Sequence, residues 1–297
     1  MTVAQYGAAA HTRPYLGKIG LRGRERLINA ASYLLLLIAI AIVFFPLAWM
    51  LTVSVRPNLE VMRMPPAWLP QVFTLEGYRK IFASPRYLVV FANTMLVSLV
   101  VTALSLILGA MAAYALARFK FAGQRAVLMF LITTQMFPLV LLCIPYFRIF
   151  ITLGLYDTRT SLIVVYLTFT LPFCILMLRS YFINIPRDIE EAAMVDGCSR
   201  LGAIFRTLVP MSYPAFIGAG LYTFLLAWNE FLFAVVLIES WENRVLTMAI
   251  YSLMAEFVTD WNTMMAFSVL ASLPLVMAFI FLQKFMVQGM TAGALTS

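Results

Sequence analysis

Polar residues divide this chain into six long apolar runs. The runs cover roughly residues 28–55, 89–116, 126–151, 162–182, 215–238 and 264–287. About 20 consecutive apolar residues are enough for a helix to cross the hydrocarbon layer of a membrane. A helix is favoured there because it bonds every backbone polar group within its own segment. The pattern therefore predicts an all-α membrane protein with six transmembrane helices.

Polar or helix-breaking residues interrupt three of these runs: Gln135, Pro138, Pro145, Pro172 and residues 228–230. A proline removes one intrahelical hydrogen bond, so we expect kinks where neighbouring helices or a water-filled cavity can bond the freed carbonyl groups. Such kinks are compatible with moving parts. They are equally compatible with static contacts between helices.

Glu230 is the costliest of these interruptions. A carboxylate near the centre of a membrane helix costs about 2.5 to 3.5 kcal/mol, so its side chain should face the protein interior or a polar cavity. A partner on a neighbouring helix and a polar solute are both suitable contacts for it. Amide groups suit a hydroxyl-rich ligand, and aromatic rings offer flat faces to a sugar ring. The candidate pathway residues are Asn93, Gln135, Tyr222, Trp228, Asn229 and Glu230.

Composition agrees with a membrane setting. The 297 residues are 63% hydrophobic and only 11% charged, which is too apolar for a water-surrounded domain. The net charge of +8 is spread along the flanks of the apolar runs, which indicates anchoring at the membrane surface rather than nucleic-acid binding.

Several kinds of chemistry find no support in the sequence. The three cysteines show neither metal-ligand spacing nor an extracellular pair, and His11 is the only histidine. No nucleophile–base or metal constellation indicates an enzyme. A phosphate-binding GxxxxGK[ST] segment is also missing, so any ATP used must be bound by a separate subunit.

Basic residues set the expected orientation. They are concentrated before the first run and after the second, which places residues 1–27 and, by parity, 183–214 and 288–297 in the cytoplasm. Segments 56–88 and 239–263 would then form external loops. The five basic residues between Arg56 and Arg86 disagree with this orientation.

A polar stretch between the fourth and fifth runs predicts two short helices. Pro186 suits the first turn of the first helix, where acidic residues also match the positive end of the helix dipole, and Gly197 supplies its stop. Ile204, Phe205 and Leu208 give the second helix an apolar side. These features fit a rigid plug for another protein and an ordinary surface hairpin equally well.

The spacing within this stretch resembles the EAA loop of ABC importer membrane subunits. Glu191-Ala192-Ala193 is followed after three residues by Gly197, and after nine more by Thr207-Leu208-Val209-Pro210. Thr207 and Val209 depart from the usual isoleucine and leucine. The resemblance implies a coupling helix that fits a groove on an ATPase subunit. Its residues here would be Glu190, Glu191, Ala192, Ala193, Asp196, Gly197 and Arg200.

Further segments are similar to carbohydrate-type ABC importer permeases, among them the smaller membrane subunit of the maltose importer. They are residues 73–78, 93–94, 153–158, 171–173 and 228–231. Residues 289–294 also resemble that subunit's C-terminal tail, which in the family reaches into the ATPase dimer interface. By this resemblance Gly289, Thr291 and Gly293 would contact the ATPase, although Met290 departs from the pattern.

The resemblance implies a type I ABC importer permease in the bacterial cytoplasmic (inner) membrane, with both termini in the cytoplasm. It would form half of the translocation path for a sugar or sugar derivative. Its expected partners are a homologous second permease, two ATPase subunits, an external solute-binding protein and membrane lipid. This chain would bind no cofactor, and ATP and Mg would be held by the ATPase subunits. A permease for amino acids or peptides is the nearest alternative, followed by a secondary transporter.

Overall fold

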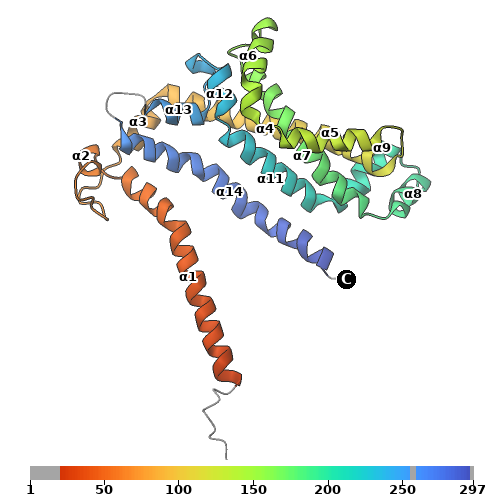
Figure 1. Cartoon of the computed structure of the whole chain (residues 1–297), viewed down its shortest axis with the longest axis horizontal. Coiled ribbons are helices and arrows are strands. Elements are labelled where there is room, and N and C mark those ends of the chain that lie inside the picture. The colour runs from red at the N-terminus through yellow and green to blue at the C-terminus, as the bar shows by residue number, and fades with distance from the viewer. Residues whose placement is uncertain (1–20, 255–258, 295–297) are drawn as a thin grey trace, which may run out of the picture. The chain divides into compact units, whose positions relative to one another are not determined.

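The computed structural model describes residues 21–254 and 259–294 of the chain (Figure 1). It consists of two units, residues 1–49 and residues 50–297, which are considered separately. The first unit contains most of helix α1 (Leu21–Ser54), whose apolar portion Ile28–Ser54 is long enough to cross a membrane. The helix therefore begins before the first predicted apolar run.

The second unit is built almost entirely from helices. In chain order they are α2 (Asn58–Val61), α3 (Glu76–Ala83), α4 (Pro85–Arg118), α5 (Gln124–Met136), η1 (Leu139–Leu142), α6 (Cys143–Thr152), α7 (Arg159–Ile183), α8 (Arg187–Val195), α9 (Arg200–Ala203), η2 (Ile204–Leu208), α10 (Val209–Met211), α11 (Tyr213–Asn229), α12 (Leu232–Leu237), η3 (Trp241–Asn243), α13 (Leu246–Ser252) and α14 (Trp261–Ala294). The described residues contain no β-strand, which confirms the predicted all-α class.

Four helices are long and apolar enough to span a membrane unaided. They are Ile28–Ser54, Pro85–Arg118, Arg159–Ile183 and Trp261–Lys284. Two further apolar stretches are bent pairs: Gln124–Met136 with Leu139–Thr152 at 96°, and Ile204–Met211 with Tyr213–Asn229 at 76°. The described residues thus contain four candidate spans, or up to six if each bent pair crosses the membrane once. The predicted count of six stays a prediction.

The interruptions fall at two of the places that the sequence indicated. α5 ends at Met136, before Pro138, and α11 ends at Asn229, before Glu230. The apolar run over 215–238 is consequently not one continuous helix. Pro172 behaves differently, because α7 continues through it from Arg159 to Ile183.

Small and hydroxylated residues bring the central helices together. α4 packs along α7 more extensively than any other pair. Gly109 of α4 lies so close to α7 that an added Cβ would stand 2.9 Å from Cys174 Sγ. Nearby, Ser105 and Thr170 share a buried hydrogen bond of 2.9 Å. Close backbone approach and interhelical hydrogen bonds of this kind hold helices together where lipid removes the usual hydrophobic driving force.

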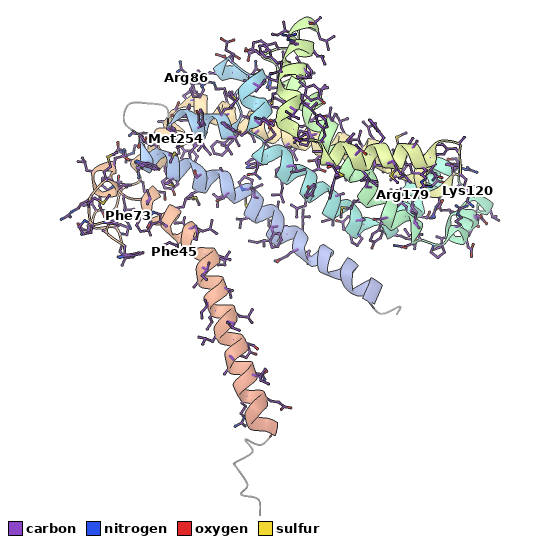
Figure 2. All side chains as sticks on the ribbon, in the orientation of Figure 1. Phe45, Phe73, Arg86, Lys120, Arg179 and Met254 are labelled. Carbon is purple, nitrogen blue, oxygen red and sulfur yellow. The ribbon has the colours of Figure 1, made fainter. Side chains whose placement is uncertain are left out.

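The two ends of the second unit carry different features. Lys120 and Arg179 lie at the end that bears α8 and α9, whereas Arg86 and Met254 lie at the opposite end (Figure 2). The predicted coupling loop and the segment 239–254 are therefore at opposite ends of the helical bundle.

Candidate functional site

Helix α8 is fastened to the C-terminal end of α4. Glu190 is buried, and Arg118 Nε donates a 2.6 Å hydrogen bond to its Oε1 within an ion pair. The same guanidinium donates through Nη2 to the Ile185 carbonyl at 3.0 Å, and Arg187 Nη2 donates to the Arg118 carbonyl at 3.1 Å. Glu190 therefore faces inward and fixes the first turn of α8.

The other predicted coupling residues divide into inward-facing and outward-facing groups. Ala193 is buried beside Glu190 on the inner side of the helix. The Arg200 guanidinium lies 5.2 Å from the centre of the Phe119 ring. Glu191, Ala192, Asp196, Gly197 and Arg200 are all exposed. α8 ends where Gly197 adopts φ +88°, a conformation that glycine adopts without strain.

Two exposed apolar side chains extend this outward surface. Val195 is 87% exposed and Phe205 is 64% exposed, whereas Ile204 and Leu208 are buried. The predicted apolar side of the second helix is therefore split, since Phe205 points outward while its two companions join the core. Sequence reasoning missed Val195, and its place just before Asp196 and Gly197 was the available signal.

A cavity of about 630 Å³ brings four of the six predicted pathway residues together: Gln135, Tyr222, Asn229 and Glu230. It lies at the break after α5 and at the break between α11 and α12. Aromatic rings from Phe137, Phe169 and Phe231 also line it. The two interruptions of the apolar runs thus border a single cavity with both polar and aromatic walls.

The polar groups of this cavity are held in place by backbone contacts. Gln135 Nε2 donates to the Phe169 carbonyl at 3.0 Å, and Asn229 Nδ2 donates to the Leu225 carbonyl at 2.8 Å. Glu230 accepts from the amide nitrogens of Phe233, at 2.9 Å, and Ala234, at 3.2 Å. Its carboxylate therefore caps the first turn of α12, where the amide groups lack intrahelical partners.

Asn93 and Trp228 lie outside this cavity. Asn93 is buried and donates to the carbonyls of Glu242, at 2.7 Å, and Arg244, at 2.9 Å. Trp228 is buried and donates from Nε1 to the Ala271 carbonyl at 3.2 Å. Asn93 thereby holds the segment after α12, and Trp228 joins α11 to α14. Their place in a substrate pathway stays a prediction.

The predicted tail contacts lie near the C-terminal end of α14. Gly289, Thr291 and Gly293 fall in the last turns of α14, where side chains lie outside the described residues. Within the described part of the chain, no group of three or more histidine, cysteine, aspartate or glutamate side chains is placed to hold a metal ion.

Most of the basic residues between Arg56 and Arg86 contact other residues of the protein. These contacts could not be predicted from the sequence. The buried Arg56 guanidinium donates to the carbonyls of Ala67 and Trp68. Lys80 pairs with Glu76 and Asp260, each at 3.0 Å, and Arg63 donates to Gln71. Arg86 lies 5.9 Å from the centre of the Trp241 ring. The positive charge of Lys80 is thereby offset by two carboxylates.

Asp157 joins two loops of the second unit through hydrogen bonds. Its Oδ1 accepts hydrogen bonds from the amide nitrogens of Glu239 and Ser240, both at 3.0 Å. Burial raises the pKa of Asp157, but these hydrogen bonds outweigh it and hold the pKa below its usual value. The loop after α6 is thereby joined to the loop after α12.

Comparison with known proteins decides the family. Residues 105–292, more than half of the chain, match the family described as "Binding-protein-dependent transport system inner membrane component". This chain belongs to that family. It is a permease of a binding-protein-dependent ABC importer, a multi-pass inner-membrane protein, and the predicted resemblance to carbohydrate-type permeases is confirmed.

Several relatives of this permease are named as permease proteins of ABC transporters or transport systems. It is 38% identical over 272 residues to the inner membrane ABC transporter permease protein YcjP of Escherichia coli, covering 91% of this chain and 97% of the relative. The sulfoquinovosyl glycerol transport system permease SmoH of Agrobacterium fabrum is also 38% identical, with 84% and 88% covered. The trehalose/maltose permease MalG of Thermococcus litoralis is 32% identical, with 92% and 99% covered. Since these relatives are permease subunits, the prediction of a transporter subunit rather than an enzyme is confirmed.

A solved structure shows the same fold. A bacterial ABC transporter involved in alginate import has a chain that superimposes with a TM-score of 0.74 at 22% identity, covering 88% of this permease and 97% of that chain. At this identity the likeness shows the architecture and nothing about the transported molecule.

Proposed function

We propose that this permease forms half of the translocation path for a sugar or sugar derivative, and that α8 couples the path to a separate ATPase. The cavity lined by Gln135, Tyr222, Asn229 and Glu230 carries this proposal. Its volume of about 630 Å³ lies within the range of small-molecule sites. Amide and phenol groups beside aromatic rings provide hydrogen bonds and flat faces, both of which a sugar ring requires.

The names of two relatives support a sugar rather than an amino acid as the transported molecule. SmoH is named for sulfoquinovosyl glycerol and MalG for trehalose and maltose. The similarity to these two relatives extends over 84% and 92% of this permease. Amino acids and peptides are charged at both ends. Among the described residues that line the cavity, Glu230 is the only one with a charged side chain, and its carboxylate is already used to cap α12. The lining therefore suits an uncharged sugar better than a molecule with a charge at each end.

The contacts of α8 support the coupling role. Glu190 and Arg118 join α8 to α4, and α4 packs along α7 and α11, which both contribute to the cavity wall. A displacement of α8 by a partner would therefore be passed along α4 to the two helices that line the cavity. The partners in this scheme are a homologous second permease, an external solute-binding protein and two ATPase subunits that hold ATP and Mg.

The test is uptake by the complete complex in proteoliposomes that contain ATP. Labelled sulfoquinovosyl glycerol, trehalose, maltose and methionine are supplied with the cognate solute-binding protein. We expect uptake of a sugar that requires both the binding protein and ATP hydrolysis. Uptake of methionine and of none of the other three molecules would favour the amino-acid alternative. Uptake by this chain without ATPase subunits would favour a secondary transporter.

A matched pair of asparagines tests the cavity itself. Asn229, the last residue of α11, and Asn184, the residue after α7, each donate to the carbonyl four residues earlier, but only Asn229 lines the cavity. Replacing Asn229 by alanine should weaken the apparent transport affinity about fivefold, because a hydrogen bond contributes about 1 kcal/mol. Asn184→Ala should leave that affinity unchanged. Equal effects of the two variants on affinity, in complexes that assemble normally, would contradict the pathway assignment.

A further inference from the structure

The segment between α1 and α3 exposes an unusual number of large apolar side chains. Leu59 and Met64 are nearly fully exposed, at 89% and 87%, and Trp68 and Leu69 are also well exposed. The complete set in this segment, residues 57–75, is Leu59, Met62, Met64, Trp68, Leu69, Val72, Phe73 and Leu75. We call residues 57–75 the apolar loop. Exposed apolar patches of this kind on a protein mark sites of contact with membranes or other molecules.

Side chains of Arg56, just before the apolar loop, and of Glu60, within it, bond backbone groups of the loop. Arg56 Nη1 donates to the Ala67 carbonyl at 2.6 Å, and Nη2 donates to the Trp68 carbonyl at 2.7 Å. The Glu60 carboxylate accepts from the amide nitrogens of Gln71, at 2.8 Å, and Val72, at 3.1 Å. These contacts bond backbone groups of the loop, while its large apolar side chains remain exposed. A segment that enters an apolar medium needs this arrangement, because an unbonded backbone group there is costly.

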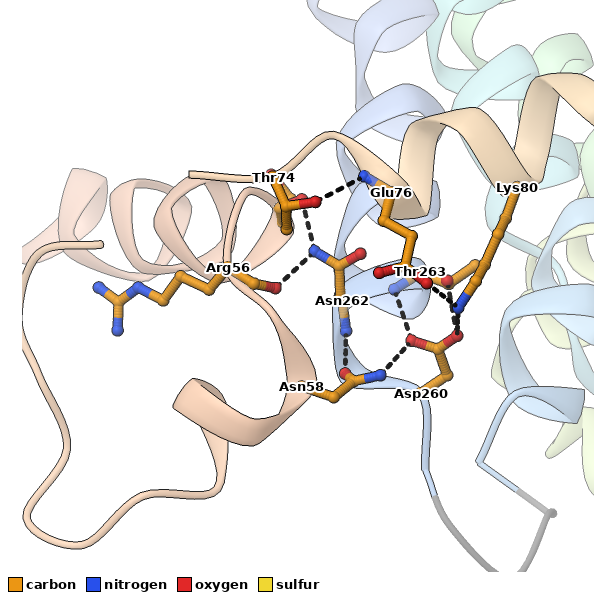
Figure 3. Close-up of polar contacts among 9 residues, drawn as sticks. Arg56, Asn58, Thr74, Glu76, Lys80, Asp260, Asn262 and Thr263 are labelled. Atoms are coloured by element: carbon orange, nitrogen blue, oxygen red, sulfur yellow. Dashed lines mark hydrogen bonds and ion pairs between the residues drawn. The ribbon is translucent and has the colours of Figure 1, made fainter. Parts of the chain in front are cut away.

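The loop is also fixed to the ends of two membrane helices. The span of α1 ends at Ser54, and the span of α14 begins at Trp261. Asn262 Nδ2 donates to the carbonyls of Ser54, at 2.9 Å, and Arg56, at 2.7 Å. Asn58 joins the same network by donating to Asp260 at 2.7 Å, and the Arg56 side chain extends away from it toward the loop (Figure 3). The apolar loop is thereby held beside the ends of two apolar helices that are long enough to span a membrane.

We propose that the apolar loop inserts into the lipid headgroup region of the membrane, with Trp68 and Leu69 at the boundary of the acyl chains. Tryptophan favours this boundary because its ring is apolar and its N–H group can meet a polar partner. The only charged residues of the loop, Glu60 and Arg63, are used in hydrogen bonds within it. Lipid therefore suits this surface better than a soluble protein, whose reversible interfaces are about as polar as the rest of its surface.

The test is quenching of Trp68 emission by brominated lipid. The complete complex is placed in bilayers whose phosphatidylcholine carries bromine either near the headgroup or near the end of the acyl chain. The emission of Trp68 is obtained as the difference between the wild type and Trp68→Phe, a substitution that keeps an aromatic ring. We expect bromine near the headgroup to remove most of this emission and bromine near the chain end to remove much less.

Trp228 provides the matched control, because it is buried between α11 and α14. The emission lost in Trp228→Phe should be quenched much less by either lipid. Trp68 emission that is insensitive to both lipids would overturn the proposal. In that case, a change in Trp68 emission on addition of the solute-binding protein would assign the loop to protein docking. No change would assign it to a contact with another membrane subunit.

Discussion

At the scale of single residues, the charged side chains near the membrane helices are stabilised by specific partners. Glu190 pairs with Arg118, and Asp260 accepts hydrogen bonds from Asn58, Thr263 and Lys80. The sequence predicted that Glu230 needs a partner in the protein interior. It could not predict that the partners are the backbone amides of the next helix, because that requires knowing where α11 ends.

The ionisation of Asp260 should make the stability of the folded protein depend on pH. Burial raises its pKa, but the hydrogen bonds from Asn58, Thr263 and Lys80 outweigh burial and lower the pKa from 3.8 to about 2. A lowered pKa in the folded state stabilises the protein fully above pH 3.8, and this stabilisation is lost as the pH falls toward 2. The difference in unfolding midpoint between the wild type and Asp260→Asn should be constant from neutral pH to about pH 4 and shrink below it. A difference that does not change in acid would contradict this assignment.

Replacing Glu230 by leucine should harm stability and uptake more than replacing it by glutamine. Glutamine keeps one oxygen that can accept from the amides of Phe233 or Ala234, whereas leucine leaves both amides without an acceptor. Each unbonded buried group costs about 1 to 3 kcal/mol, so Glu230→Leu should lower the unfolding midpoint and sugar uptake more than Glu230→Gln does. Unfolding and uptake are measured on the same purified complexes. Normal uptake by a stable Glu230→Leu complex would exclude a role in capping and in the path.

At the scale of elements, different residues interrupt the two broken apolar runs. α5 ends before Pro138, and Phe137 is extended there, because a proline disfavours the helical conformation of the residue before it. α11 ends at Asn229, and the Glu230 carboxylate accepts hydrogen bonds from the first amides of α12. Pro172 is buried inside α7, and the helix continues through it. The sequence therefore predicted two of the interruptions correctly, but a proline alone does not decide whether a helix ends.

The contact between α4 and α7 yields a prediction at this scale. An added Cβ on Gly109 would stand 2.9 Å from Cys174 Sγ, closer than these atoms normally approach. Gly109→Ala should therefore destabilise the permease by about 1 to 3 kcal/mol through overpacking. Cys174→Ala removes the sulfur, so the double variant should recover part of the loss in a double-mutant cycle of thermal unfolding. Additive losses would show that the helices do not meet closely at this point.

At the scale of the whole molecule, the polar loop after α7 joins the membrane helices to the surface that α8 presents. The sequence predicted a helix here and its stop at Gly197, both of which the structure contains. It did not separate Glu190 from Glu191, because adjacent carboxylates on a short helix look alike in sequence. In the structure Glu190 is buried against Arg118 and Glu191 is exposed. The two residues should therefore affect transport in different ways.

Glu191→Lys should weaken recruitment of the ATPase subunits, because it reverses a charge on the exposed surface of α8. Glu190→Gln keeps that surface but leaves the Arg118 charge buried without its partner, and breaking a buried pair costs about 3 to 5 kcal/mol. This variant should retain ATPase recruitment and lose hydrolysis stimulated by the binding protein, since α8 is no longer firmly joined to α4.

Asp188→Asn removes an exposed charge from the first turn of α8 and serves as the control. Co-purification measures recruitment, and ATP hydrolysis with and without the binding protein measures coupling. If Glu190→Gln and Glu191→Lys lost recruitment equally, the ion pair would act only in folding the loop, and the link from α8 through α4 to the cavity would be wrong.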